Sequence, residues 1–204
     1  MHEGAVMAVN IAKAKNAETV VNILTEGFAD DAVIRWIYPG EQEYRSLAPA
    51  FFKYMFDHTL AVGEALLDAD GRGVLLTEPV SPSGAGREHG RSEIQTIGGN
   101  GDCADRLASY MFGGADVHPM EESHWYWSFG SVLPSSRGIG VGRSLFRRSI
   151  RDKGEPIYGE ATSHRNLSLY ERLGARKLFE WAHPDGPSSY AFWIPRGAED
   201  KMRP

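Results

Sequence analysis

The sequence predicts an α+β fold, in which helices flank one mixed, mostly antiparallel sheet of about seven strands. Helical repeats come first in the chain, an antiparallel hairpin follows them, and the C-terminal half holds one strand–turn–helix–strand unit. The chain has 204 residues, which is enough for a sizeable core, and it shows no internal repeat. We therefore expect one domain over residues 1–204.

The first half of the chain is predicted to hold three helices and three strands. Loose alternation of apolar side chains predicts a first strand over residues 5–12. Apolar side chains at helical spacing predict helices over residues 17–29, 32–38 and 41–59. Two apolar runs around a glycine-rich turn predict a hairpin of residues 61–68 and 74–78.

The second half begins with a segment rich in Ser, Gly and Pro, residues 79–101, which is predicted to be a loop. Helices are expected over residues 104–112, from the glycine-rich turn near Gly142 to about Lys153, and over 165–173. Strands are expected over residues 125–133, 155–162, 176–181 and 189–194.

Composition excludes several classes of protein. The formal net charge is -5, whereas nucleic-acid binders carry a basic surface. The single cysteine, Cys103, allows no intrachain disulfide and no multi-cysteine metal site, and the histidines show no metal-binding spacing. No apolar run approaches a membrane span, and the N-terminal residues do not resemble a signal peptide. We expect a cytoplasmic protein without a metal, a nucleic-acid partner or a membrane partner.

Residues 125–142, with the sequence WYWSFGSVLPSSRGIGVG, hold the most informative pattern. Large apolar side chains come first, Pro134 interrupts them, and closely spaced glycines follow. This order predicts a strand, a glycine-rich turn and a helix N-terminus. The first N–H groups of a helix have no partner within it, and glycines let a ligand come close, so the segment is typical of a phosphate site.

Two blocks of sequence resemble the GNAT superfamily of acetyltransferases. The first is PSSRGIGVG at residues 134–142, which is similar to the family's acetyl-CoA signature. The second joins EATS at 160–163 to Asn166 and to YERLGA at 170–175. More loosely, GFADD and RW within residues 27–36 resemble small-molecule N-acetyltransferases of the puromycin N-acetyltransferase type. The resemblance implies a GNAT fold and direct acetyl transfer from acetyl-CoA in a ternary complex.

The resemblance implies that main-chain N–H groups of the turn hold the pyrophosphate of coenzyme A. The residues concerned are Arg137, Gly138, Ile139, Gly140, Val141 and Gly142. A dinucleotide site, with Glu160 on the ribose, is the rival interpretation. That fingerprint requires G-x-G-x-x-G directly after a strand, whereas here the third glycine comes one position early and three residues intervene. Coenzyme A is therefore favoured.

The resemblance also implies that residues 129–132 of the central strand separate from the neighbouring strand at a bulge. Gly130 is the expected bulge position. Val132 is expected to contact the cofactor, with its N–H facing the thioester oxygen. Trp127 is expected to line the pocket rather than to catalyse.

Tyr170 and Asn166 correspond to functional positions of the family. The resemblance implies that Tyr170 contacts coenzyme A and protonates its departing thiolate, which suits a phenol. The alternative is an aromatic core residue of the predicted helix. Asn166 is expected to hold the pantetheine arm, with a helix cap as the alternative. The general base is open among Glu160, His124, Glu122, an aspartate of the acceptor wall and a water relay.

The first helices form one wall of the acceptor site in the family. This places Phe28, Asp30, Asp31 and Trp36 near the amine, where an aspartate attracts a cation and an indole stacks on a ring. The alternative is that the aromatic residues are core and that the aspartates only interrupt a helix.

The sequence thus predicts an acetyl-CoA-dependent N-acetyltransferase of a small-molecule amine, either an antibiotic or a biosynthetic intermediate, that is a monomer or a homodimer. One alternative is a non-catalytic GNAT-like domain that binds acyl-CoA or a metabolite. Another is an acyltransferase with a different acyl-CoA or with a protein amine as acceptor. A tyrosine at position 170 together with Asn166 favours the enzyme, because a sensor needs no proton donor at the sulfur.

Overall fold

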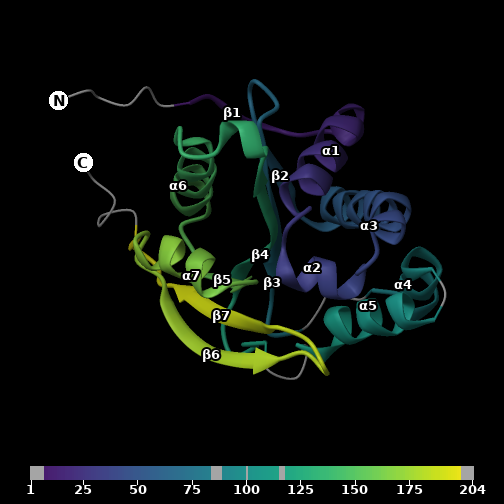
Figure 1. Ribbon diagram of the computed structural model, residues 1–204. Coiled ribbons are helices and arrows are strands. Elements are labelled where there is room, and N and C mark those ends of the chain that lie inside the picture. Colours follow the sequence, from purple (N-terminus) through teal and green to yellow (C-terminus); the bar gives the residue numbers. More distant parts are fainter. Residues whose placement is uncertain (1–6, 84–88, 100, 115–117, 199–204) are drawn as a thin grey trace.

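The computed structural model describes residues 7–83, 89–99, 101–114 and 118–198, and it centres on a seven-stranded sheet (Figure 1). The strands lie in the order β1-β2-β3-β4-β5-β7-β6. Their bounds are β1 Val9–Ile11, β2 Glu64–Asp68, β3 Gly73–Val80, β4 His124–Val132, β5 Ile157–Ala161, β6 Arg176–Ala182 and β7 Ser188–Ile194. Among the strands that the structure describes, only β4 and β5 pair in parallel. The predicted α+β class and the mostly antiparallel sheet are confirmed.

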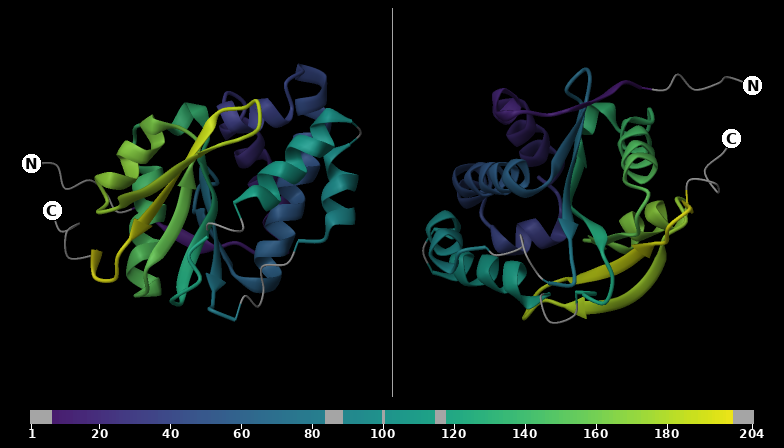
Figure 2. Two further views of the ribbon diagram at one scale, coloured as in Figure 1. Left: turned by 90° about the horizontal axis from the view of Figure 1, so that it is seen from below. Right: turned by 180° about the vertical axis from the view of Figure 1, so that it is seen from behind.

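Helices cover both faces of the sheet (Figures 1 and 2). The helices of one face are α1 Ala17–Gly27, α2 Ala32–Ile37, α3 Glu41–Val62, α4 Arg91–Gly98 and α5 Asp102–Gly113. Those of the other face are α6 Val141–Lys153 and α7 His164–Glu171. Of the helices that the structure describes, none combines the length and the apolar character of a membrane span.

Side chains of β2 and β3 alternate between the two faces of the sheet and so contribute to a hydrophobic core on each face. Leu67, Val74 and Leu76 are buried among the side chains of α1 to α5. Leu66 and Leu75, their neighbours in sequence, are buried in the cluster that α6 and α7 complete. Successive side chains of a strand point to opposite faces, so one run of apolar residues supplies both layers.

The segment 79–101, predicted to be a loop, contains regular structure. Strand β3 extends to Val80, and α4 forms over Arg91–Gly98. Ile94 is fully buried, and Ile97, one turn later, packs against the same core. Two apolar side chains three positions apart give this short helix a face to bury. The first strand is also shorter than predicted within the described residues, at Val9–Ile11.

The hairpin of β6 and β7 reaches across the molecule to the helices of the other layer (Figures 1 and 2). His183, just after β6, lies against Trp36 of α2 and Tyr110 of α5, with ring centroids 5.0 and 5.8 Å away. The hairpin therefore joins α2 and α5 beside the place where β4 and β5 separate.

Candidate active site

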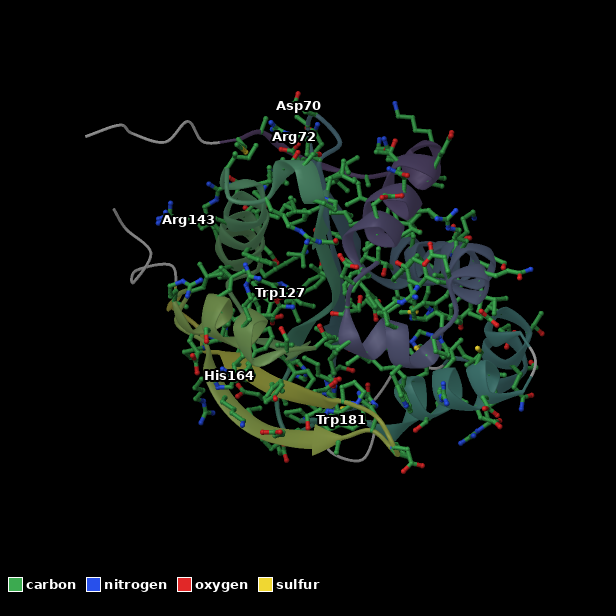
Figure 3. The ribbon with its side chains drawn as sticks, viewed as in Figure 1. Asp70, Arg72, Trp127, Arg143, His164 and Trp181 are labelled. Carbon is green, nitrogen blue, oxygen red and sulfur yellow. The ribbon has the colours of Figure 1, made fainter. Side chains whose placement is uncertain are left out.

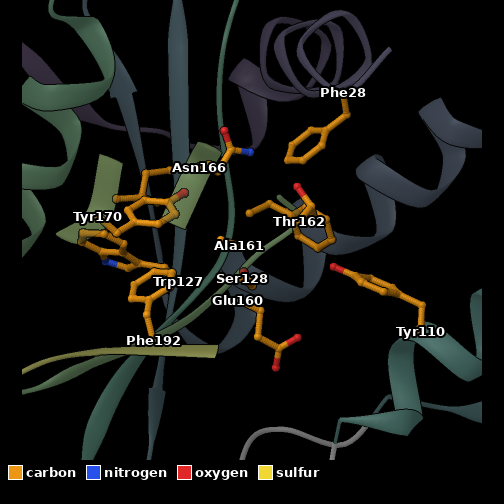
Figure 4. Close-up of a pocket in the computed structure, with 13 residues that line it drawn as sticks. Phe28, Tyr110, Trp127, Ser128, Glu160, Ala161, Thr162, Asn166, Tyr170 and Phe192 are labelled. Atoms are coloured by element: carbon orange, nitrogen blue, oxygen red, sulfur yellow. The ribbon is translucent and has the colours of Figure 1, made fainter. Parts of the chain in front are cut away.

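Strands β4 and β5 separate beyond Trp127. Their parallel pairing runs from Trp125 opposite Ile157 to Trp127 opposite Gly159, whereas β4 continues to Val132. A pocket opens at the separation (Figure 4). Its lining residues are Phe28, Leu75, Tyr110, Trp127, Ser128, Phe129, Gly130, Glu160, Ala161, Thr162, Asn166, Tyr170 and Phe192. The predicted separation of the central strand from its neighbour is confirmed.

The bulge of β4 lies at Ser128, so the predicted position at Gly130 is wrong. Leu76 of β3 pairs with Phe129 and Thr77 pairs with Trp127, which leaves Ser128 as the extra residue. Gly130 pairs regularly with Leu75. A Cβ atom at Gly130 would lie 3.1 Å from Leu75 Cδ1, so glycine here permits close packing rather than a bulge.

The hydrogen-bond ladder determines which main-chain groups of β4 face the separation. Leu133 N–H donates to Arg72 O at 2.8 Å, next to the regular pairing of β3 with β4. Hydrogen-bonded pairs alternate in an antiparallel ladder, so Ser131 and Phe129 also turn toward β3. Val132 and Gly130 turn their N–H groups the other way, into the separation. Gly130 lines the pocket, whereas Val132 lies beyond it, beside Gly142 of α6.

The glycine-rich turn is an exposed main-chain cradle at the start of α6. Gly138 and Gly140 have φ values of 82° and 99°, where a side chain is strained, and a Cβ atom on either would meet nothing within 4 Å. Gly140 is the N-cap of α6. The first N–H groups of the helix point outward there and the helix dipole adds positive potential, so the turn fits an anion such as a pyrophosphate.

Arg137 uses its side chain to tie this turn to α1. Its Nη2 donates to Gly27 O at 2.8 Å, at the C-terminal end of α1. The guanidinium therefore serves a helix end, and the fit of the turn to a phosphate rests on main-chain N–H groups.

Tyr170 projects from α7 into the pocket beside Phe192 and Trp127 (Figure 4). Its ring stacks on that of Phe192, with the ring centroids 4.3 Å apart. The centroid of the Trp127 ring lies 6.0 Å from that of Tyr170. Burial, with a smaller contribution from the charge of Asp31, raises the pKa of Tyr170 to about 12. The phenol is thus protonated at neutral pH and fixed in orientation, as a proton donor requires.

Asn166 lies one helical turn before Tyr170 and lines the same pocket wall. Ser163 is the N-cap of α7, and its Oγ accepts from Asn166 N at 3.2 Å. Ser163, and not Asn166, therefore caps this helix. The side-chain amide of Asn166 is not used in capping and lies at the pocket.

The opposite wall of the pocket combines one carboxylate with aromatic rings (Figure 4). Phe28 comes from the end of α1, Tyr110 from α5 and Glu160 from β5. Tyr158 donates its hydroxyl proton to Glu160 Oε1 at 2.9 Å. Trp127, seen inside the molecule in Figure 3, is oriented by its Nε1 donating to Ser149 Oγ at 2.9 Å.

Several pocket residues lack a sequence signal, among them two that carry a hydroxyl group. Tyr110 and Ser128 were not among the expected site residues, yet both line the pocket. Tyr110 belongs to the helix expected over residues 104–112, to which the sequence assigns no part in the site, and no motif marks its aromatic ring. Ser128 depends on the position of the bulge, which the sequence misplaces.

Asp31, Asp30 and Trp36 lie outside the pocket lining. Asp31 caps α2, its Oδ1 accepting from the N–H groups of Val33 and Ile34, and Thr162 donates to its other oxygen. Burial raises the pKa of Asp31. Asp30 is exposed on the surface, and Trp36 packs on His183. These contacts favour the structural alternative for Asp31 and Trp36 over direct contact with an acceptor.

His124 also lies outside the pocket lining. It begins β4, is 1% exposed, and its Nε2 lies 2.9 Å from His118 Nε2. Its Nδ1 lies 2.9 Å from Glu122 O. These contacts do not favour the base role expected for His124. Among the described residues, no cluster of three or more His, Cys, Asp or Glu side chains could hold a metal ion.

No family model matches the chain, but several solved structures do. One solved structure, from Corynebacterium glutamicum, is described as histone acetyltransferase HPA2 and related acetyltransferase. Its sequence is 28% identical to this chain, and the two structures match with a TM-score of 0.67 over 94% of this chain and 97% of the Corynebacterium chain. Drosophila melanogaster polyamine N-acetyltransferase, which forms N-acetylagmatine, is 15% identical with a TM-score of 0.63, over 93% and 99%. Aedes aegypti arylalkylamine N-acetyltransferase 2 is 14% identical with a TM-score of 0.63, over 92% and 97%. The two insect proteins show a shared fold.

The separated parallel strands and the similarity to the Corynebacterium structure define the class of protein as an acyltransferase. Within that class, the chain belongs to the GNAT superfamily of acetyltransferases, and the family predicted from residues 134–142 and 160–175 is confirmed.

Proposed function

We propose that this protein is an acetyl-CoA-dependent N-acetyltransferase of a small-molecule amine, with residues 1–204 as one GNAT domain. The observation that carries the proposal is the pocket at the separation of β4 and β5, into which Tyr170 projects. The glycine-rich turn lies at the end of the same strand. The thioester and the pyrophosphate of one donor, which the pantetheine arm connects, thus each have a fitting site along β4.

On the donor side, N–H groups of residues 138–142 bind the pyrophosphate, and Arg137 holds their turn against α1. The N–H of Val132, turned into the separation, pairs with the pantetheine arm. Gly130, which lines the pocket, takes the role expected for Val132 and donates its N–H to the thioester oxygen. Asn166 contacts the arm from α7.

On the acceptor side, Glu160 supplies negative charge, while Phe28, Tyr110 and Trp127 supply aromatic walls. This combination suits a cationic amine. The names of the Drosophila and Aedes proteins, which act on agmatine, polyamines and arylalkylamines, support a small amine as acceptor.

In the reaction, the nitrogen of a neutral amine attacks the thioester carbon, a C–N bond forms and the C–S bond breaks. The Gly130 N–H stabilises negative charge on the carbonyl oxygen. Tyr170 gives its phenolic proton to the departing sulfur, and the high pKa of this phenol keeps the proton in place until then. The nitrogen then loses one proton to solvent, and solvent returns one proton to the Tyr170 phenolate.

The test supplies acetyl-CoA and a panel of polyamines, arylalkylamines and amine-bearing antibiotics, and it measures release of free thiol. We expect acceptor-dependent release with at least one class of amine. Calorimetry with coenzyme A runs beside it. Binding without turnover across the panel would favour a non-catalytic acyl-CoA-binding domain, and absence of binding would reject both functions.

A further inference from the structure

Glu78 is a buried carboxylate beside the pocket, and the reaction described above does not use it. It lies on β3 and is 2% exposed. Its Oε1 accepts hydrogen bonds from Ser128 Oγ and Thr59 Oγ1, each at 3.0 Å. A carboxylate in the protein interior costs free energy, and such groups are concentrated where a protein needs proton chemistry.

Ser128 links Glu78 to the pocket. It is the extra residue of the bulge in β4 and it also lines the pocket. Its hydroxyl thus lies between the space for an acceptor and the Glu78 carboxylate. Residues 125–132 of β4 include no carboxylate of their own, so a hydroxyl that leads to Glu78 supplies a route to one.

The second oxygen of Glu78 faces a histidine. His58 Nε2 lies 4.0 Å from Glu78 Oε2, and the His58 side chain is 13% exposed. Within the described part of the chain, this Nε2 is buried and has no hydrogen-bond partner. A small side-chain movement would bring the two atoms within hydrogen-bond distance.

From His58 a path continues to half-buried groups nearer the surface. The His58 and His89 rings lie 4.3 Å apart, and the Tyr54 hydroxyl lies 3.2 Å from His89 Nδ1. Glu93 of α4 adds negative charge near Tyr54. Imidazole and phenol groups can both donate and accept protons, so this end of the path can pass protons toward the surface.

We propose that Ser128, Glu78 and His58 form a proton relay that deprotonates the acceptor amine. This inference rests on the proposed N-acetyltransferase function. An alkylammonium gives a proton to Ser128 Oγ while the serine hydroxyl proton passes to Glu78, which leaves a neutral amine to attack. Glu78 then passes the proton to His58, and His89 leads it to solvent. Primary amines resemble lysine, with a pKa of about 10.4, so at neutral pH nearly every acceptor arrives with a proton to lose.

The principal test replaces Glu78 with glutamine, which keeps the size of the side chain and an oxygen that accepts from Ser128 and Thr59. The pH profile of kcat/KM is measured with an amine that the wild-type protein acetylates. We expect a loss of about 100-fold at pH 7, the usual scale of acid–base catalysis. The loss should shrink as the pH approaches the pKa of the amine, since free amine then needs no relay. The KM for acetyl-CoA should not change.

Two further variants separate a relay from a structural role. Ser128→Ala should give the same change in the pH profile as Glu78→Gln, and the double variant should be no worse than either, because residues of one relay are not additive. Glu64→Gln, a carboxylate of neighbouring β2 paired with Lys153, is the matched control and should keep the wild-type profile.

Acetylation by the wild-type protein in the same assay establishes the proposed function whichever way the variants behave. If the pH profiles of kcat/KM for Glu78→Gln and Ser128→Ala run parallel to that of the wild-type protein, the relay is overturned and the proposed function stands. If Glu78→Gln does not fold, Ser128→Ala and His58→Asn serve as the test variants. Each is expected to show the same change in the pH profile of kcat/KM. Profiles parallel to that of the wild-type protein would rule out the relay.

Discussion

The ring of Tyr170 stacks on the ring of Phe192, with centroids 4.3 Å apart and planes inclined by 21°. One ring comes from α7 and the other from β7, so the contact joins a helix after β5 to the strand that pairs with β5. Packing on Phe192 fixes the direction of the Tyr170 phenol, and burial keeps its proton bound. Orientation and protonation state, the two properties of a proton donor, thus have separate structural causes.

Replacement of Tyr170 by phenylalanine should lower kcat by about 100-fold, because the leaving thiolate loses its proton donor. The ring stays stacked on Phe192, so the melting temperature and the affinity for coenzyme A should change little. Tyr190→Phe, which removes a phenol outside the pocket lining, is the control and should keep full turnover. Unchanged turnover in Tyr170→Phe would remove the assigned role.

Gly140→Ala should weaken coenzyme A binding by about tenfold, equivalent to about 1.4 kcal/mol. At a φ of 99° an alanine distorts the start of α6, where the N–H groups converge. Gly154→Ala is the matched control, because Gly154 has a φ of 61° at the other end of the same helix and equally open surroundings. Both variants should lose stability, on the order of 1–3 kcal/mol from backbone strain. Equal coenzyme A affinities of the two, measured by calorimetry, would contradict a phosphate site at this turn.

His183 should make the protein less stable in mild acid. Burial lowers the pKa of His183 from 6.5 to about 4, so between these values the unfolded chain binds a proton that the folded chain does not. The free energy of unfolding should therefore fall as the pH drops through this window, by roughly 1.4 kcal/mol per pH unit at most for one proton. His183→Gln should flatten that slope in chemical denaturation, whereas His164→Gln, on the exposed surface, should leave it intact. A slope unchanged in His183→Gln would assign the acid sensitivity to another group.

The sequence predicts the parts of the site that depend on local chain geometry. The turn around Gly140 and the position of Tyr170 on α7 follow from glycine spacing and helical repeat, which are local properties. The bulge at Ser128 could not be predicted, because it depends on the register between β4 and β3, about 50 residues apart in sequence. Helix α4 was missed because its apolar face, centred on Ile94, is small, and tertiary packing stabilises it against a polar local composition.

The residues of the acceptor wall likewise could not be predicted from local sequence, because tertiary contacts determine which side chains reach the pocket. Asp31 and Trp36 are of the residue types expected at an amine site. In the folded protein, however, Asp31 accepts a hydrogen bond from Thr162, and Trp36 packs on His183. Glu160 and Tyr110 meet in the pocket from a strand and a helix that no sequence motif connects.

A crystal structure of the protein with coenzyme A bound tests the central assignment most directly. We expect the pyrophosphate to accept hydrogen bonds from N–H groups of residues 138–142, the pantetheine arm to lie between β4 and β5, and the sulfur to lie within hydrogen-bond reach of the Tyr170 hydroxyl. Coenzyme A bound away from the separation of these strands, or a sulfur out of reach of Tyr170, would contradict it.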